Sequence, residues 1–219
     1  MCSSDLVRAG AMEQQRRAFD FTLLFAVPFV AAFLAVPDVI TRALFARGAF
    51  TKGDAAAAGA TLAAYAVGLI PFVLIRSAVS TFYARKNTAM PVKASLTGLT
   101  VNMGLKLLLM GSLAQVGLAL ATAIGAWINL LLVLGFAVRA GYLELNRPLG
   151  QSLMKFAICG VVLAAVFWLA ARYAAAHFGN MAFHDEITLL VLIGVGGMVY
   201  AGSILGLFGP RWLKGLVKG

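Results

Sequence analysis

Six long apolar stretches run through the chain and constrain its fold more than any other feature. A helix needs about 20 mostly apolar residues to cross the roughly 30 Å hydrocarbon core of a bilayer. Inside lipid a helix also satisfies its own backbone hydrogen bonds, so it is the form that such stretches adopt. We therefore predict an all-α, polytopic transmembrane helix bundle. Its six spans cover residues 19–37, 55–84, 92–113, 116–138, 152–176 and 187–208.

The composition supports a membrane protein. Hydrophobic residues make up 62% of the chain and charged residues 12%, whereas soluble domains have about 45–50% and about 25%. This balance excludes a disordered chain, a collagen, a disulfide scaffold and most soluble enzymes. The net charge of +10 does not indicate a nucleic-acid partner, because the apolar stretches leave little surface for a basic patch.

The distribution of lysine and arginine predicts the orientation. Twelve of the 18 basic residues lie in or next to the loops on one side of the spans and four in or next to the loops on the other side. Basic residues concentrate in cytoplasmic loops, so we predict six spans with both termini in the cytoplasm. The twelve are Arg8, Arg16, Arg17, Arg85, Lys86, Lys93, Arg139, Arg147, Lys155, Arg211, Lys214 and Lys218, and the four are Arg42, Arg47, Lys52 and Arg172.

Local signals mark where the spans begin and end. Pro37 and Asp38 end the first span, and Thr51 and Asp54 have capping-box spacing before the second. The first span could also be read as a cleaved signal peptide. Asp20 within it, and the lack of a clear cleavage site, favour a retained helix.

Two basic residues and two asparagines inside the spans are the candidate substrate-binding residues. Arg76 lies in the second span and Lys106 in the third, while Asn102 and Asn129 lie in the third and fourth. Ionisable residues within a membrane usually face the bundle interior or a wet cavity. Cations without carboxylate partners indicate an anionic substrate. The alternatives are snorkelling of the two cations to the headgroups and interhelical hydrogen bonding by the asparagines.

Glycines pattern the last span and form a second set of candidates. Gly194, Gly197 and Gly202 would leave a shallow groove for a lipid tail, or would allow close helix packing. No nucleophile triad, phosphate loop or metal-ligand spacing accompanies them, and Cys2, Cys159, His177 and His184 form no metal site. His177 and His184 are predicted to share an external loop. The sequence predicts no enzymatic activity, metal or cofactor, and makes an intramembrane transferase a weak alternative.

Motifs between Leu44 and Asn129 resemble a known family. In order they are Leu44–Thr51 (LFARGAFT), Ala64–Leu69 (AYAVGL), Phe82–Arg85 (FYAR), Thr88 with Pro91–Lys93 (PVK), Val101–Asn102, Gly117–Thr122 (GLALAT) and Ala126–Asn129 (AWIN). This order and spacing resembles the C-terminal half of the MviN/MurJ family of bacterial lipid II flippases. That family belongs to the multidrug/oligosaccharidyl-lipid/polysaccharide exporter superfamily.

The resemblance implies a particular organisation. Family members are fourteen-helix proteins, and the six spans would correspond to the ninth through fourteenth helices. Residues 1–18 would form a cytoplasmic N-terminal segment, 19–138 four helices of the C-terminal lobe, and 139–219 two extra C-terminal helices with a cytoplasmic tail. The first residues, Met1–Leu6, do not resemble a linker of this family and suggest a truncated or mis-joined start.

The resemblance also implies a function. The chain would be a fragment of a flippase that moves lipid II from the cytoplasmic to the periplasmic leaflet of the bacterial inner membrane by alternating access. Its partners would be the undecaprenyl-linked peptidoglycan precursor, membrane lipids and proteins of cell-wall synthesis. The alternatives are another exporter of the superfamily, for drugs or polysaccharide lipids, and a non-transporting scaffold of cell-wall assembly. The sequence leaves open the coupling ion, the oligomeric state, and the activity of the chain alone.

Overall fold

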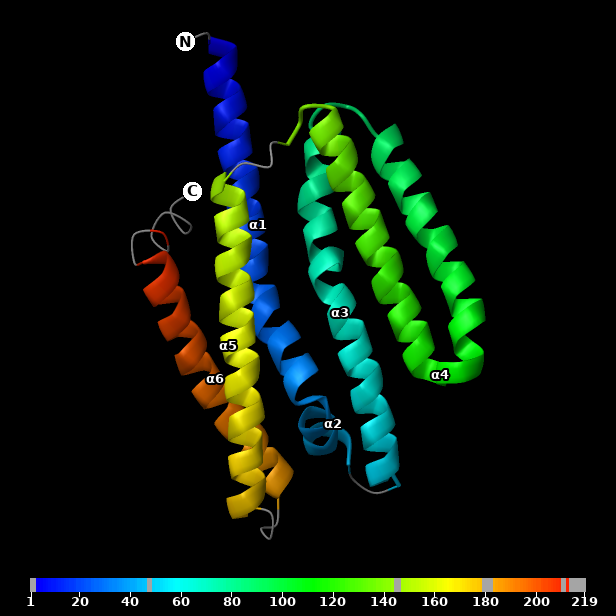
Figure 1. Cartoon of the computed structure of the whole chain (residues 1–219), viewed down its shortest axis with the longest axis vertical. Helices are drawn as coiled ribbons and strands as arrows, with labels where there is room; N and C mark the ends of the chain where they lie inside the picture. The colour runs from blue at the N-terminus through cyan, green and yellow to red at the C-terminus, as the bar shows by residue number, and fades with distance from the viewer. Residues whose placement is uncertain (1–2, 47–48, 144–146, 179–182, 210–211, 213–219) are drawn as a thin grey trace. The chain divides into compact units, whose positions relative to one another are not determined.

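The apolar stretches form long helices in a computed structural model of the chain, which describes residues 3–46, 49–143, 147–178, 183–209 and 212. These residues contain helices and no strand (Figure 1). Five helices are long and apolar enough to cross a membrane. The helices are α1 (Ser3–Ala35), α2 (Pro37–Phe45), α3 (Lys52–Tyr83), α4 (Ala89–Arg139), α5 (Arg147–Phe178) and α6 (His184–Phe208).

The helix α4 supplies two of the six predicted spans. A straight helix of its 51 residues would be about 77 Å long, more than twice the hydrocarbon thickness. Instead the backbone leaves helical geometry at Ala114 (φ 46°, ψ −126°) and the helix turns back on itself (Figure 1). Its first arm, 89–113, and second arm, 115–139, match the predicted third and fourth spans, which confirms the predicted break between them.

The short helix α2 was not predicted. It begins at Pro37, whose missing N–H costs nothing in a first turn, and it buries Ile40, Thr41 and Ala43. The Thr41 hydroxyl donates a hydrogen bond to the carbonyl oxygen of Ala55 in α3, at 2.8 Å. At nine residues, α2 is too short to produce a transmembrane-length apolar stretch. The residues that it contacts, such as Asp185 of α6, lie far from it in the sequence.

The predicted capping box at the start of α3 is confirmed. The Thr51 backbone N–H and hydroxyl donate to Asp54 Oδ2, at 2.9 and 2.7 Å, and the Asp54 N–H donates to Thr51 Oγ1 at 3.2 Å.

The prediction that His177 and His184 share a loop is wrong. His177 lies in the last turn of α5 and His184 is the first residue of α6, because both helices extend beyond the apolar residues that revealed them.

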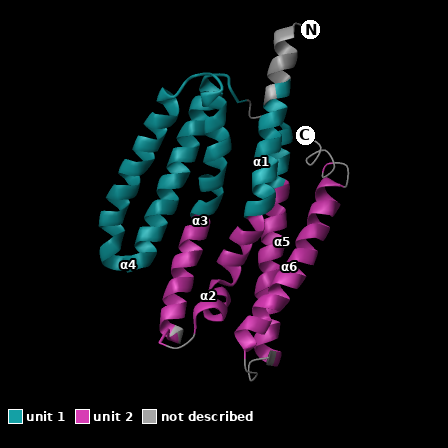
Figure 2. Ribbon diagram, turned by 180° about the vertical axis from the view of Figure 1, so that it is seen from behind, with its two compact units in different colours: residues 1–26, 68–154 teal, residues 27–67, 155–219 magenta. Residues whose placement is uncertain are grey.

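The helices divide into two compact units (Figure 2). Unit 1 comprises residues 1–26 and 68–154, and unit 2 comprises 27–67 and 155–219. The predicted division into residues 1–18, 19–138 and 139–219 groups the helices differently from these units and stays a prediction.

The core of unit 1 depends on small residues. Gly68 of α3 lies against the second arm of α4, where a Cβ on the glycine would come within 2.7 Å of the Ala123 Cα atom. Between the two arms, a Cβ on Gly98 would come within 2.9 Å of the Gly125 carbonyl oxygen. Small residues allow helix backbones to approach closely, which is the main packing mode within lipid.

The core of unit 2 joins α1, α2, α5 and α6. Its central cluster of buried apolar side chains consists of Ala31, Val36, Ile40, Leu163, Phe167 and Leu192. An ion pair between Arg42 Nε of α2 and Asp185 Oδ1 of α6, 3.2 Å apart, lies at the end of this unit.

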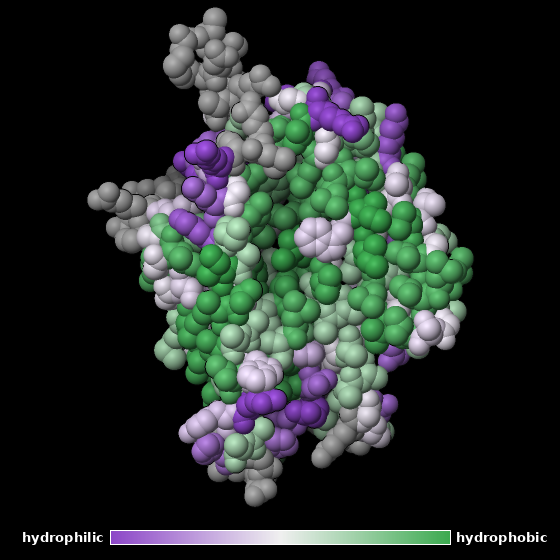
Figure 3. All heavy atoms as spheres, viewed as in Figure 1, coloured by the Kyte–Doolittle hydropathy of each residue, from purple (hydrophilic) through white to green (hydrophobic). Residues whose placement is uncertain are grey.

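The outer surfaces of the helices are apolar. On the face shown in Figure 3, hydrophobic residues cover the middle of the helices and hydrophilic residues gather near their ends. In the first arm of α4, the Leu107 side chain is 81% exposed. Large exposed apolar surfaces are not stable in water but suit lipid, so this is a multi-pass membrane protein.

Candidate functional site

Arg76 lies in a groove of unit 1 between α3 and the first arm of α4. The groove has a volume of about 530 Å³. Apolar side chains form most of its wall, and Arg76, Ser80, Tyr83 and Ser95 supply the polar groups. Among the described residues, no carboxylate lies within ion-pair distance of Arg76. An exposed guanidinium in an otherwise apolar groove can bind an anionic group while apolar chains contact the walls.

Asn129 is connected to this groove through a serine. Its Nδ2 lies 3.5 Å from Ser95 Oγ, which lines the groove. The predicted residues Arg76 and Asn129 therefore share one region of unit 1. Sequence reasoning missed Ser95. It lies seven residues before Asn102, two helical turns away on the same face, and that spacing could have identified it.

The two asparagine side chains face the opposite arm of α4. Asn102 Oδ1 and Asn129 Oδ1 are buried and accept no hydrogen bond from the described residues. A buried polar atom without a partner costs about 1–3 kcal/mol. Neither carbonyl oxygen forms the interhelical hydrogen bond considered for these side chains, whereas Asn129 does bond across the arms through its Nδ2 to Ser95 Oγ.

Lys106 lies one turn beyond Asn102 on the first arm and is half-buried. It does not line the groove that contains Arg76. The structure therefore brings together Arg76, Ser95 and Asn129, and places Asn102 and Lys106 farther along the same arm.

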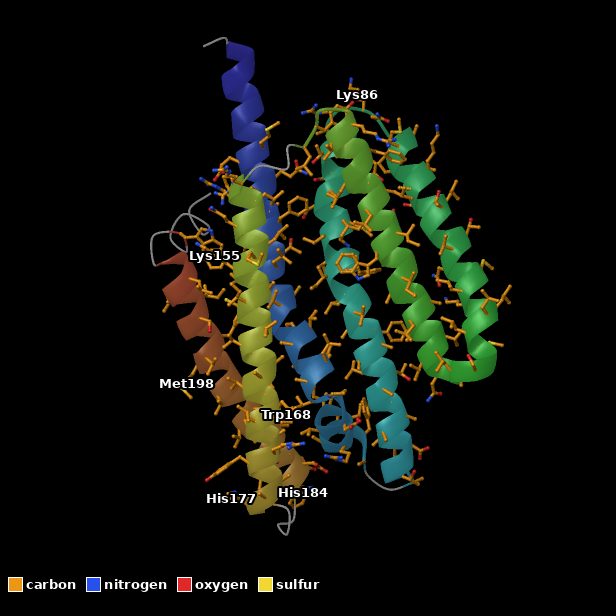
Figure 4. The ribbon with its side chains drawn as sticks, in the orientation of Figure 1. Lys86, Lys155, Trp168, His177, His184 and Met198 are labelled. Carbon is orange, nitrogen blue, oxygen red and sulfur yellow. The ribbon has the colours of Figure 1, made fainter. Side chains whose placement is uncertain are left out.

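The predicted lipid-tail residues lie on the open side of α6. A Cβ atom added at Gly194, Gly197 or Gly202 would meet no other residue within 4 Å. By contrast, a Cβ on Gly196 would overlap the Phe167 ring. Close packing of α6 thus falls to Gly196. Met198, labelled in Figure 4, lies beside these glycines on α6 and is 72% exposed.

A buried carboxylate is the polar feature that sequence reasoning underrated. Asp20 of α1 is 1% exposed. Its Oδ1 accepts a hydrogen bond from the Ser152 hydroxyl of α5 at 2.6 Å, and its Oδ2 lies 3.5 Å from Arg16 Nη1. No spacing in the sequence links residues 20 and 152. In the described part of the chain, no group of three or more His, Cys, Asp or Glu residues could hold a metal ion.

Comparison with known proteins gives a consistent result. A family model described as lipid II flippase MurJ matches residues 9–204. A protein of Rhizobium meliloti (strain 1021) named "probable lipid II flippase MurJ" is 32% identical over 201 residues, which are 91% of this chain and 38% of that protein. One of Rickettsia prowazekii (strain Madrid E), with the same name, is 27% identical over 99% of this chain and 41% of its own length.

The fold also matches a solved structure. A structure titled "lipid II flippase MurJ, inward closed conformation" superposes with a TM-score of 0.75 at 22% sequence identity, covering 92% of this chain and 40% of that one. This likeness concerns the fold alone. The chain spans about two fifths of the length of these relatives.

Proposed function

Because this chain belongs to the family of MurJ lipid II flippases, we propose that it forms part of a flippase for the lipid-linked peptidoglycan precursor. The transport would run from the cytoplasmic to the periplasmic leaflet of the bacterial inner membrane, by alternating access and without covalent chemistry. The observation that carries the proposal is Arg76, an arginine without an acidic partner among the described residues, in an apolar groove between α3 and α4.

The chemistry of the substrate fits this groove. A diphosphate cannot enter hydrocarbon alone, because an unpaired buried charge costs several kcal/mol or more. The Arg76 guanidinium would offset this cost, and the amides of Asn102 and Asn129 would contribute polar contacts. Lys106, farther along the arm, would add a second positive charge.

The tail of the substrate would stay outside the polar region. A polyprenyl chain is apolar and would lie against an apolar surface. The open side of α6, with Gly194, Gly197 and Gly202, offers such a surface, and we assign it to contact with the lipid tail.

The test is a chimera in a strain depleted of its own flippase. The N-terminal spans of the Rhizobium meliloti relative would be joined to this chain, and growth and lipid II in the outer leaflet would be measured. We expect the chimera to restore both, and the 219-residue chain alone to restore neither. Growth on a wild-type scale without lipid II translocation would favour a scaffold. A chimera that inserts normally and exports drugs but not lipid II would favour another exporter.

A further inference from the structure

A second cavity in unit 1 is lined mainly by polar side chains, and the proposed transport does not use it. This polar pocket has a volume of about 270 Å³ and lies where α1, the end of α3 and the segment after α4 meet. Its polar lining includes Gln14, Gln15, Ser77, Thr81, Arg85 and Tyr142. Ser80 alone borders both this pocket and the groove beside Arg76.

The pocket contains a buried donor without an acceptor. Gln15 is 9% exposed, and its Nε2 atom is buried with no hydrogen-bond partner among the described residues. An amide N–H that leaves water without a new hydrogen-bond partner is unfavourable. A ligand that brings an acceptor oxygen into the pocket would recover that cost.

Arg85 is held in the lining of the pocket by aromatic packing. Its guanidinium carbon lies 4.1 Å from the centre of the Tyr142 ring. Tyr142 in turn makes an edge-to-face contact with the buried ring of Phe82, at 5.5 Å between centroids. Stacking on an aromatic face fixes the plane of a guanidinium and leaves its N–H groups free to donate at the edge.

The charge balance of the pocket favours an anion. Its described lining contains a guanidinium, two amides and three hydroxyls in addition to the Tyr142 hydroxyl, and no carboxylate. The nearby Glu13 is already engaged, through hydrogen bonds from Arg16 and Arg17. Several donors around one cation match a group that carries several acceptor oxygens, and phosphate is the commonest such group for arginine.

We propose that the polar pocket binds a phosphate group, with Arg85 and the Gln15 amide as its principal donors. The pocket shares only Ser80 with the groove beside Arg76, so we treat it as a site separate from the proposed transport path. Two kinds of molecule could supply this phosphate near the membrane surface. It belongs either to the headgroup of an anionic phospholipid or to a free phosphate in solution.

The experiment measures ligand retention by the purified 219-residue chain with native mass spectrometry. The probes are phosphatidylglycerol, diacylglycerol as the phosphate-free lipid, and inorganic phosphate. The variants are Arg85→Gln and Gln15→Glu, the second of which keeps the size of the side chain and replaces a donor with a negative charge. The control is Lys93→Gln, which removes an exposed positive charge outside the pocket.

We expect each pocket variant to bind the phosphate-bearing probe about tenfold more weakly, equivalent to about 1.4 kcal/mol, and Lys93→Gln to bind it as the wild type does. Retention of phosphatidylglycerol in excess of diacylglycerol identifies a lipid source, and retention of inorganic phosphate alone identifies a soluble source. Equal binding by the wild type and both pocket variants would overturn the proposal. So would an equal loss in Lys93→Gln, which would reveal diffuse surface charge. Circular dichroism and size-exclusion profiles confirm that each variant is folded.

Discussion

The Cβ atom of Asn129 lies 2.9 Å from the position that a Cβ atom on Gly98 would occupy. The reverse pair has the same relationship, since Asn102 Cβ lies 2.8 Å from the corresponding position at Gly125. Each arm of α4 thus carries a glycine followed four residues later by an asparagine, and each glycine receives the asparagine of the other arm. The repeated pattern holds the hairpin together at this crossing.

Replacement of Gly98 by alanine is therefore expected to destabilise the hairpin. The new methyl group would contact both the Asn129 side chain and the Gly125 carbonyl oxygen, and overpacking of this kind costs about 1–3 kcal/mol. Gly104→Ala on the same arm is the matched control, because a Cβ there meets nothing within 4 Å and alanine is the better helix former by about 1 kcal/mol. Thermal unfolding in detergent would compare them. Equal midpoints for the two variants would contradict the packing role of Gly98.

Loss of the Ser152 hydroxyl is expected to destabilise the contact between α1 and α5. Ser152→Ala leaves Asp20 Oδ1 buried without its 2.6 Å hydrogen bond. A hydrogen bond to a charged group contributes about 1.5–3 kcal/mol. Ser112→Ala is the control, because the Ser112 hydroxyl is exposed and its bond is 3.5 Å long. Unchanged unfolding of Ser152→Ala in a denaturant titration would show that the hydrogen bond contributes nothing.

The role of Arg76 predicts a difference between two arginine variants in the chimera. Arg76→Ala is expected to reduce lipid II translocation by about tenfold or more, because hydrogen bonds to a charged group contribute about 1.5–3 kcal/mol. Arg172→Ala is expected to have little effect, since Arg172 stacks on Trp168 at 4.1 Å on the exposed surface of α5. A translocation assay at matched expression decides the matter. Equal rates for the two variants would remove Arg76 from the proposed substrate path.

The predicted orientation is tested by cysteine labelling in membrane vesicles. In a background without Cys2 and Cys159, new cysteines at Asn87 and Gly150 are expected to react with an impermeant reagent from the same side. A cysteine at Gly53 is expected to react from the opposite side. The contact of Arg85 with Tyr142 supports the first expectation. Labelling of positions 87 and 150 from opposite sides would refute the six-span arrangement.

The backbone at Ala114 predicts a stabilising substitution. Its φ of 46° with ψ of −126° lies in a region that only glycine adopts without strain. Ala114→Gly is expected to raise the free energy of unfolding by about 1 kcal/mol, whereas Gln115→Gly at the adjacent helical position is expected to lower it. A lower unfolding midpoint for Ala114→Gly would show that the reversal is not strained.

The spans could be predicted from the sequence because lipid imposes one simple requirement on every residue within them. The division of α4 between residues 113 and 116, and the capping box of Thr51 and Asp54, followed from local patterns alone. The helix α2 could not be predicted in this way. Its contacts, such as Thr41 with Ala55, depend on where α3 and α6 come to lie.

The candidate site was predicted in part. Intramembrane charge identified Arg76, which does lie in a groove, but nothing in the sequence indicated that Asn129 reaches it through Ser95. The polar pocket is a similar case. Gln15, Arg85 and Tyr142 are ordinary residues near helix ends, and only the packing of α1 against α3 reveals that they surround one cavity.

The abrupt reversal of α4 has a consequence for biogenesis. Because Ala114 alone breaks the helical geometry between the two arms, we expect both arms to insert into the bilayer together as one hairpin. The accessibility of a tag inserted after Leu113 would report whether the two arms enter the bilayer together.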